Sequence, residues 1–381
     1  MLSRIKFDVD ILVKDILNQL PEEVWISNST KFFDPAIGGG QFVRAIEKRL
    51  RSYGHGDDNI RDRVYGFEES SLHIKFAVNK YKLVGQYVCS PYEKFFELDN
   101  SMKFDVIVGN PPYQGKAALH QQFFNKSYSL LNDNGYLAFI QPATTYFNKK
   151  EKQKAPVDTM MATIKSNKCN ITIVGPEVFE NAIIRNDLSI TVLNKCPSDS
   201  NLIEEIKYKN GTKFNNVALE DITMTQLDPA IYRSIRIKYE VFISNFGCLE
   251  DKVSKDVTKL KAPLAKIRGN APSDCDFYTF IPKLTAMAST KVAGNYYNDF
   301  GILAKSKTEV ENIYDYLTSY VARFGLAILK FSQNTLNKEF NSVPLVPFNK
   351  TYTDAELYKM LELTDDEVNA IKKVIVDYHG R

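Results

Sequence analysis

A short apolar run that ends in a proline turn is the feature that most constrains the fold. Residues 104–113 read Phe-Asp-Val-Ile-Val-Gly-Asn-Pro-Pro-Tyr. The run predicts a buried strand, and open α/β sheets place their chemistry at the C-terminal end of such strands. Pro111 and Pro112 each fix one φ angle and lack an N–H group, so the turn is stiff and rich in acceptors. An ordinary turn after a strand is the simpler alternative, because Asn and Pro are common turn residues.

The groups in this turn suit a planar amino group. The Asn110 amide oxygen and the Pro111 carbonyl can accept its two N–H groups, while the Tyr113 ring offers a face for stacking. Two such acceptors favour a pyramidal nitrogen and stabilise the positive charge that develops on it during methylation. No general base is required, and the nearest histidine, His120, is interpreted as a surface or helix-packing residue.

A glycine-rich turn follows an earlier predicted strand. Residues 30–42 read Thr-Lys-Phe-Phe-Asp-Pro-Ala-Ile-Gly-Gly-Gly-Gln-Phe, with a β run that ends at Asp34 and a helical pattern that begins at Phe42. The three glycines allow positive φ angles and close approach of the backbone to a ligand. The spacing differs from the dinucleotide pattern Gly-x-Gly-x-x-Gly, so a pyrophosphate ligand is not favoured.

A second acid follows the next predicted strand. Residues 64–67 form a short apolar run that ends at Glu68. In nucleoside-binding doubly wound sheets, an acid at this position accepts hydrogen bonds from ribose hydroxyls. A solvated surface glutamate is the simpler alternative.

Together these motifs resemble a known family. Asp-Pro-Ala-x-Gly-x-Gly-x-Phe at 34–42, the acid Glu68 and Asn-Pro-Pro-Tyr at 110–113 occur in the order of the gamma-type S-adenosylmethionine-dependent DNA adenine-N6 methyltransferases of the restriction-modification kind. The resemblance covers about residues 5–200. It implies that residues 136–147 form the fifth strand and the proline-containing turn after it, and that 187–195 is the last hairpin strand.

The resemblance also implies roles for single residues. Catalytic roles would fall to Asn110, Pro111, Pro112 and Tyr113. S-adenosylmethionine would be bound by Asp34, Pro35, Ala36, Gly38, Gly40, Glu68, Ser90, Pro91, Asn110 and Pro112. The flipped adenine would stack on Tyr113 and, from its other side, on Phe179, for which ordinary packing is an alternative.

Two segments depart from the family pattern. The third strand ends in Cys89-Ser90-Pro91-Tyr92 instead of an acid, which leaves the Ser90 hydroxyl or a backbone carbonyl to meet the cofactor adenine. Phe7-Asp8-Val9-Asp10 stands where the family has Thr-Pro, so that Asp8 or Asp10 would cap the helix at 11–20. Both changes bear on cofactor affinity more than on the chemistry.

The expected fold is α/β. A Rossmann-like class I methyltransferase sheet of seven strands, the last one antiparallel, would be followed by an α+β target-recognition domain. The expected limits are 1–200 for the cofactor-binding catalytic domain, 201–345 for DNA target recognition and 346–381 for a helical tail. At 381 residues the chain has room for two domains.

The second half shows weaker patterns. Alternation at 204–209 with the turn Asn210-Gly211 predicts a hairpin, and 277–281 is a strand candidate. Residues 312–331 have helical spacing, with Tyr316 and Arg323 expected to pack or be solvated rather than reach DNA. Two terminal helices are expected to begin near residues 353 and 364, each with a Thr or Asp as its N-cap.

The charges and cysteines of the chain indicate which partners and which cellular compartment to expect. The net charge of +3 is too small to prove nucleic-acid binding, but basic residues cluster in two segments. Expected contacts to double-stranded DNA are Lys149, Lys150, Lys152, Lys154, Lys259, Lys261 and Arg268, with solvated faces as the alternative. Five cysteines without metal-ligand spacing favour a reducing cytoplasm and no metal site. The family resemblance implies that this cytoplasm is that of a bacterium or a phage-infected cell. No membrane segment is visible.

Other functions stay open. An RNA adenine methyltransferase or a glutamine methyltransferase of release factors would use the same turn on the same fold. A methylase fold kept only for binding DNA or a partner is a non-catalytic alternative. The target sequence, the oligomeric state and a separate restriction endonuclease as partner are not encoded visibly.

Overall fold

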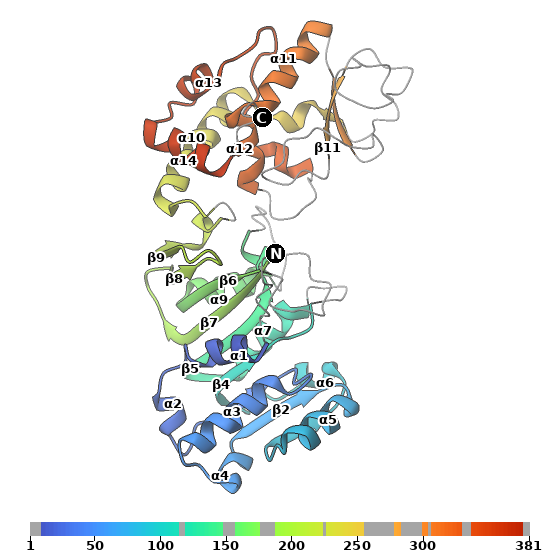
Figure 1. The fold of residues 1–381 in the computed structure, drawn as a ribbon, viewed down its shortest axis with the longest axis vertical. Helices are drawn as coiled ribbons and strands as arrows, with labels where there is room; N and C mark the ends of the chain where they lie inside the picture. Colours follow the sequence, from blue (N-terminus) through green and yellow to red (C-terminus); the bar gives the residue numbers. More distant parts are fainter. Residues whose placement is uncertain are drawn as a thin grey trace, which may run out of the picture. The chain divides into compact units, whose positions relative to one another are not determined.

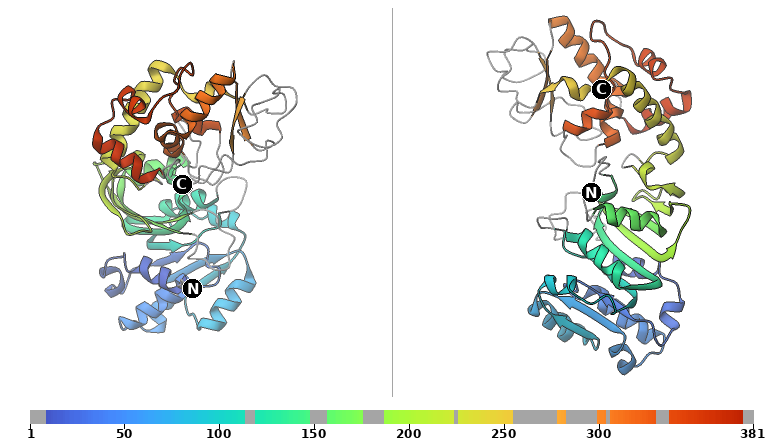
Figure 2. Two further views of the ribbon diagram at one scale, coloured as in Figure 1. Left: turned by 45° about the horizontal axis from the view of Figure 1, so that its top comes forward. Right: turned by 180° about the vertical axis from the view of Figure 1, so that it is seen from behind.

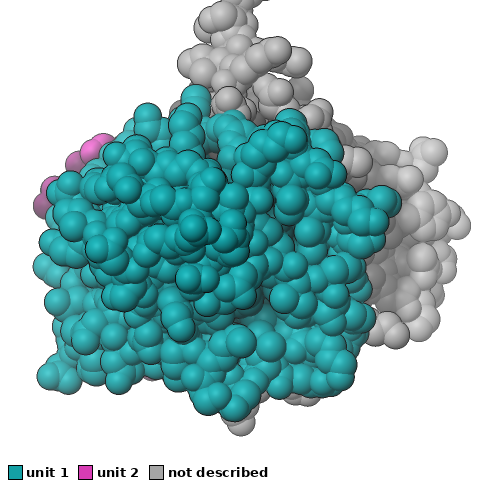
Figure 3. Space-filling view, turned by 90° about the horizontal axis from the view of Figure 1, so that it is seen from below, with its two compact units in different colours: residues 1–146, 150–219 teal, residues 147–149, 220–381 magenta. Residues whose placement is uncertain are grey.

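The chain forms two compact units. The computed structural model describes residues 9–113, 119–147, 157–175, 187–223, 226–254, 278–282, 299–303, 306–329 and 337–375. Unit 1 comprises residues 1–146 and 150–219, and unit 2 comprises residues 147–149 and 220–381 (Figure 3). None of the described helices is long and apolar enough to cross a bilayer.

Unit 1 is built on one sheet of nine strands (Figure 1). Its order is β3-β2-β1-β4-β5-β7-β6-β8-β9. The strands are β1 (Phe32–Asp34), β2 (Val64–Glu68), β3 (Gln86–Cys89), β4 (Phe104–Gly109), β5 (Leu131–Pro142), β6 (Asn167–Val174), β7 (Leu188–Pro197), β8 (Leu202–Lys207) and β9 (Lys213–Ala218). Strands β1 to β5 pair in parallel, whereas β7 runs antiparallel to both β5 and β6. The expected methyltransferase sheet with its antiparallel last strand is thereby confirmed.

The expected seven strands are present as β1 to β7, and a hairpin extends this sheet by two further strands, β8 and β9. The predicted hairpin around Asn210-Gly211 exists, and Gly211 adopts φ +89° in its turn. Its first strand, β8, pairs in parallel with β6, and both Ile203 and Ile206 are buried. Burying these side chains against the existing sheet joins the hairpin to unit 1, so the division between units falls after Leu219 and not after residue 200.

Helices cover both faces of this sheet (Figure 2). Alternate strand residues point to opposite faces, so Phe32 packs with α1, α3 and α5, whereas Phe33 meets Phe95 of α6. On this second face, an aromatic cluster links α6 and α7 to the strands through Phe95, Phe123 and Phe124. The helices are α1 (Val9–Leu17), α2 (Glu23–Ile26), α3 (Gln41–Ser52), α4 (Asp57–Arg61), α5 (Ser71–Tyr81), α6 (Tyr92–Phe96), α7 (Leu119–Leu130), α8 (Thr144–Phe147) and α9 (Val157–Lys165).

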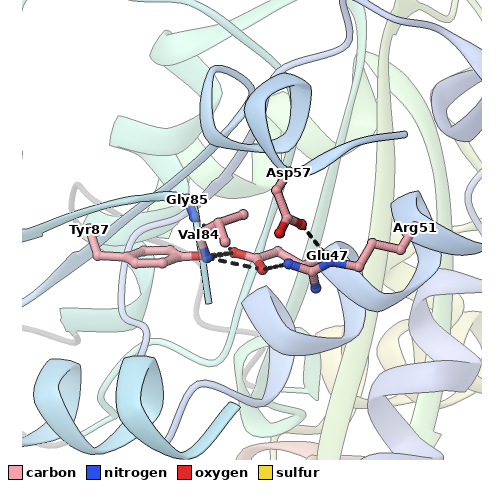
Figure 4. A network of polar contacts seen from close by, with 6 residues as sticks. All are labelled: Glu47, Arg51, Asp57, Val84, Gly85 and Tyr87. Carbon is pink, nitrogen blue, oxygen red and sulfur yellow. Dashed lines mark hydrogen bonds and ion pairs between the residues drawn. The ribbon is translucent and has the colours of Figure 1, made fainter. Parts of the chain in front are cut away.

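A buried carboxylate ties α3 to the edge strand β3 (Figure 4). Glu47 accepts hydrogen bonds from the backbone N–H groups of Val84 and Gly85, both at 2.9 Å, and from the Tyr87 hydroxyl. Its other oxygen pairs with Arg51 at 3.0 Å. These donors offset the cost of removing the charge from water. The network fixes the beginning of β3, whose far end carries one loop of the candidate site.

Unit 2 combines five helices with a small antiparallel sheet of order β10-β12-β11 among its described residues. Its strands are β10 (Val253–Ser254), β11 (Tyr278–Pro282) and β12 (Asp299–Leu303). Its helices are α10 (Pro229–Phe246), α11 (Lys307–Thr318), α12 (Tyr320–Leu329), α13 (Asp354–Met360) and α14 (Asp365–Val374). Short 3-10 helices are η2 (Leu219–Asp221), which crosses the boundary between the units, η3 (Leu249–Lys252) and η7 (Asn337–Ser342). The strand expected at 277–281 corresponds to β11, and the terminal segment shares the core of this unit.

The helix expected at 312–331 is in fact two helices that meet at Ser319. The Ser319 hydroxyl accepts the N–H of Ala322, and Asp354 accepts the N–H of Tyr320, so α12 begins with its own caps. Tyr316 and Arg323 are buried, as packing residues are.

The caps predicted near the C-terminus are confirmed. Thr353 and Thr364 each form a complete capping box with Glu356 and Glu367, three residues further on.

Candidate functional site

The glycine loop connects β1 to α3 in a conformation that only small residues adopt without strain. Gly38 and Gly40 have φ angles of +52° and +84°, and Gly40 caps the N-terminus of α3. A Cβ on Gly40 would lie 2.6 Å from the Cβ of Ala77. The Ile37 N–H donates to the Phe67 carbonyl at 3.1 Å, which holds the loop against β2. The helix predicted from Phe42 onward is present as α3.

Glu68 organises the loops around the end of β2. The side chain is only 3% exposed. Its Oε2 accepts the Gly38 N–H at 2.9 Å, and its Oε1 accepts the Ser70 N–H at 2.9 Å. The His73 ring nitrogen Nδ1 lies 3.2 Å from Oε1. A carboxylate offers about four acceptor positions, so a ribose diol fits most easily if the exposed His73 ring turns away.

Asp34 is a second buried carboxyl group beside Glu68. It is 1% exposed and accepts the Ala36 N–H at 3.0 Å. Burial raises the pKa of Asp34 to about 7, and the negative charge of Glu68 adds to this effect against the Ala36 hydrogen bond. Two buried acids create a negative potential that suits a cationic ligand.

The end of β3 adds a third loop. The Ser90 N–H donates to the Glu68 carbonyl at 3.0 Å, and Pro91 stands at the N-cap of α6. The next residue, Tyr92, was not among the predicted site residues. Burial raises its pKa, and the carboxylates of Glu68 and Asp34 contribute to the same effect, so its hydroxyl lies in the field of both acids. The sequence could have identified this tyrosine, because it directly follows the predicted cofactor contacts Ser90 and Pro91.

The proline turn follows β4, which is paired with β1 through Phe32 and Phe33. Gly109, the last residue of β4, lies so close to the glycine loop that an added Cβ would be 3.0 Å from the Asp34 carboxylate. The structure therefore places Asn110 at the strand end next to Asp34. Pro111 is buried, whereas Asn110 and Pro112 are half-buried.

Tyr113 turns back toward the start of its own motif. Its hydroxyl donates a hydrogen bond to the side-chain oxygen of Asn110. Burial raises the pKa of Tyr113, so the phenol stays protonated and acts as a donor. Its ring meets the ring of His120 edge to face, with the centroids 6.2 Å apart.

His120 is a helix-packing residue, which is one of the two roles predicted for it. It packs against Tyr113 of the Asn-Pro-Pro-Tyr turn. It is 7% exposed on α7, and its Nε2 lies 3.1 Å from the hydroxyl of Thr145 in α8. Thr145 belongs to the turn after β5 that the sequence pattern identified. The site thus brings together the turns after β1, β2, β3, β4 and β5.

Several predicted residues lie outside the described part of the chain. They are Phe179, Lys149, Lys150, Lys152, Lys154, Lys259, Lys261, Arg268 and the helix-capping candidate Asp8. The other candidate, Asp10, lies within the first turn of α1 and pairs with Arg44 at 2.7 Å. Among the described residues, no group of three or more His, Cys, Asp or Glu side chains could hold a metal ion.

The segment that contains the proline turn matches a protein family. Residues 56–174 match the family described as Eco57I restriction-modification methylase. Type II methyltransferase M.BstVI of Geobacillus stearothermophilus is 26% identical over 107 residues, which are 27% of this chain and 18% of that protein. The chain thus spans less than a fifth of the length of this curated relative. The expected resemblance to restriction-modification methyltransferases is confirmed, and the match to the family covers residues 56–174.

Two solved structures are also similar at low sequence identity. Type I restriction enzyme EcoKI M protein is 15% identical with a TM-score of 0.41, over 52% of this chain and 47% of that chain. The type IIG restriction endonuclease BpuSI is 12% identical with a TM-score of 0.42, over 96% of this chain and 63% of that chain.

Proposed function

We propose that this chain is a DNA methyltransferase that moves a methyl group from S-adenosylmethionine to N6 of an adenine turned out of duplex DNA. One observation carries the proposal. The acidic glycine loop after β1 and the Asn-Pro-Pro-Tyr turn after β4 emerge from paired strands, with Gly109 against Asp34. A cationic methyl donor and a planar amino group can therefore meet at one edge of the sheet.

The first half of the site fits the cofactor. S-adenosylmethionine supplies an electrophilic methyl group on a positively charged sulfur. The buried acids Asp34 and Glu68 would provide the negative potential for that charge, and Glu68 would accept hydrogen bonds from the ribose. The residues that would hold the cofactor are Asp34, Pro35, Ala36, Gly38, Gly40, Glu68, Ser90, Pro91, Asn110 and Pro112, and we add Tyr92.

The second half fits the target base. The Asn110 side-chain oxygen and the Pro111 carbonyl would accept the two N–H groups of adenine N6, which directs the nitrogen lone pair away from both acceptors. The same acceptors stabilise the positive charge that grows on N6 during transfer. The Tyr113 ring, with Pro112 behind the turn, would stack on the base. Turning the base out of the duplex costs a few kcal/mol, which stacking at about 1–3 kcal/mol largely offsets.

The DNA-binding surface is part of the same proposal. We assign target recognition to unit 2 and phosphate contacts to the lysines at 149–154 together with Lys259, Lys261 and Arg268, because each phosphate contact releases a condensed counterion. Phe179 would meet the extruded base from the side opposite Tyr113. A separate restriction endonuclease and a cytoplasmic location would accompany such a modification enzyme.

Two rivals share the chemistry. A glutamine methyltransferase of release factors would also use the turn at 110–113, but its accessory domain precedes the sheet, whereas unit 2 follows it here. An RNA adenine methyltransferase needs the same acceptors. Both rivals are outcomes of the test below.

Single-molecule sequencing of DNA tests this proposal. The chain is expressed in a bacterial host that lacks adenine methylation, beside Asn110→Ala as the matched variant. We expect N6-methyladenine at one recurring sequence with the unaltered chain and none with the variant. Unmodified DNA, with the methyl group found only in RNA or protein, would assign the fold to one of the rivals.

A further inference from the structure

One side of the target-base turn is closed by His120 in the first turn of α7. Its ring meets the Tyr113 ring at an interplanar angle of 88°, with 6.2 Å between centroids. Edge-to-face pairs of this geometry stabilise one ring orientation over others, because the positive edge of one ring faces the negative face of the other. The described contacts of the Tyr113 side chain are the hydrogen bond of its hydroxyl to Asn110, the edge-to-face contact with the His120 ring and packing against the core of the sheet.

His120 is itself held from the opposite direction. Its Nε2 lies 3.1 Å from the Thr145 hydroxyl, and both side chains are buried. Thr145 follows β5, whereas Tyr113 follows β4, and these strands are paired neighbours. The imidazole thus bridges two adjacent turns at the same edge of the sheet.

The imidazole of His120 has polar properties that are unusual for a side chain used only for packing. The Nδ1 atom is buried and has no hydrogen-bond partner among the described residues. A buried polar atom left without a partner costs about 1–3 kcal/mol. Burial also lowers the pKa of His120 to about 4, so the ring is neutral near pH 7 and adds no positive charge beside the target base. Leucine would fill such a space without the unpartnered atom, so packing alone does not explain a histidine here.

We infer that His120 is the positioning residue that holds the Tyr113 ring in place when the target base enters. The inference rests on the proposed function, since it concerns the same turn. In the structure the Asn110 side-chain oxygen already accepts a hydrogen bond from the Tyr113 hydroxyl. An adenine amino group needs that oxygen, so the hydroxyl must release it. The edge-to-face contact with the His120 ring, which is anchored to Thr145, is then the directional contact that keeps the Tyr113 ring in position.

The test uses the full chain and duplex DNA that contains the sequence found by modification mapping. The first readout is the single-turnover rate of methyl transfer. The second is the fluorescence of 2-aminopurine in place of the target adenine, which rises when the base leaves the stack and falls when it stacks on an aromatic ring. Calorimetry with S-adenosylmethionine is the third readout and reports whether the cofactor site is intact.

We expect His120→Ala to lower the single-turnover rate tenfold to hundredfold and to leave 2-aminopurine bright. The cofactor Kd should stay within twofold. His120→Phe keeps the ring edge and should recover most of the rate. Thr145→Val keeps the imidazole but removes its anchor, and should lower the rate threefold to tenfold. The matched control is Phe124→Leu, on the same helix and packed against Phe139, which should reduce the melting temperature without changing the rate.

The outcomes separate the two claims. No methyl transfer by the unaltered chain to any DNA would end the proposed function itself. Transfer by the unaltered chain, with His120→Ala no slower than Phe124→Leu, would overturn the role of His120 alone. If His120→Ala fails to fold, Thr145→Val and His120→Phe decide, because equal rates in Thr145→Val and the control also overturn the inference.

Discussion

The Tyr113 hydroxyl donates a hydrogen bond to the side-chain oxygen of Asn110, three residues before it in the same turn. In the proposed reaction that oxygen receives the amino group of the target adenine. The structure therefore shows the acceptor already satisfied by a donor of the chain. In that reaction, base entry would exchange one donor for another, and the Asn110 oxygen would be paired at both stages.

Tyr113→Phe tests whether the ring or the hydroxyl matters for transfer. The variant keeps the stacking face and removes the hydroxyl, so we expect its single-turnover rate to stay within about tenfold of the unaltered chain, because one hydrogen bond contributes about 0.5–1.5 kcal/mol. Tyr113→Ala should weaken binding of the extruded base by about tenfold to hundredfold, since stacking contributes about 1–3 kcal/mol. Equal losses in both variants would mean that the hydroxyl itself takes part.

Asp34→Asn should change how stability depends on pH. Burial raises the folded-state pKa of Asp34 from its ordinary value of 3.8 to about 7. The unfolded state therefore loses its proton first, and this group lowers stability as the pH rises between these two values, with a constant penalty above pH 7. The neutral amide removes this penalty. We expect the cofactor-free variant to be more stable at pH 8 by about 1–3 kcal/mol after allowance for local relaxation.

Urea denaturation of Asp34→Asn and the unaltered chain at pH 4 and pH 8 measures this difference. The gain should be present at pH 8 and small at pH 4. The same variant should bind S-adenosylmethionine more weakly in calorimetry, because the negative charge is gone. A gain of equal size at both pH values would show that ionisation of Asp34 is not its cause.

Glu68 and its neighbour His73 should affect cofactor binding in opposite directions. Glu68→Gln replaces one acceptor oxygen with a donor beside the N–H groups of Gly38 and Ser70, so we expect the cofactor Kd to rise at least tenfold. His73→Ala removes a group that occupies Oε1 and should leave the Kd unchanged or lower. Calorimetry with S-adenosylmethionine measures both. An unchanged Kd in Glu68→Gln would place the ribose elsewhere.

Glu47→Gln should destabilise unit 1 without touching the reacting groups. The amide can no longer accept at both ends from Val84, Gly85, Tyr87 and Arg51. Breaking such a buried network by removing one partner typically costs about 3–5 kcal/mol. Urea denaturation measures the loss, and Glu97→Gln, an exposed partner of Lys94, is the control. A loss no larger than in the control would mean that the network contributes little.

Much of the site was predictable because it depends on local rules. A strand followed by a glycine loop or a proline turn can be recognised within a few residues, and parallel strands bring their carboxyl ends to one edge. The capping boxes at Thr353 and Thr364 are equally local. These features can be recognised without knowing which distant residues pack together.

The rest depends on distant partners. The 202–218 hairpin joins the first sheet because β8 pairs with β6. Nothing in the sequence of the hairpin itself indicates this partner. The break at Ser319 requires Asp354, 34 residues away from the Tyr320 N–H that it accepts. Burial of His120 against Tyr113 and Thr145 follows from the approach of two turns, so the sequence alone could not decide between a surface and a helix-packing position.

Transfer of a labelled methyl group from S-adenosylmethionine to duplex DNA tests the central claim most directly, with the unaltered chain beside Asn110→Ala. Nucleosides are recovered after digestion, and cofactor binding is measured in parallel by calorimetry. We predict label in N6-methyl-2′-deoxyadenosine and a loss of about 100-fold or more in the transfer rate of Asn110→Ala. Because Asn110 is also one of the proposed cofactor contacts, the cofactor Kd should rise, but by much less than the rate falls. Label in another base or only in RNA or protein, or a variant as fast as the unaltered chain, would contradict the central claim.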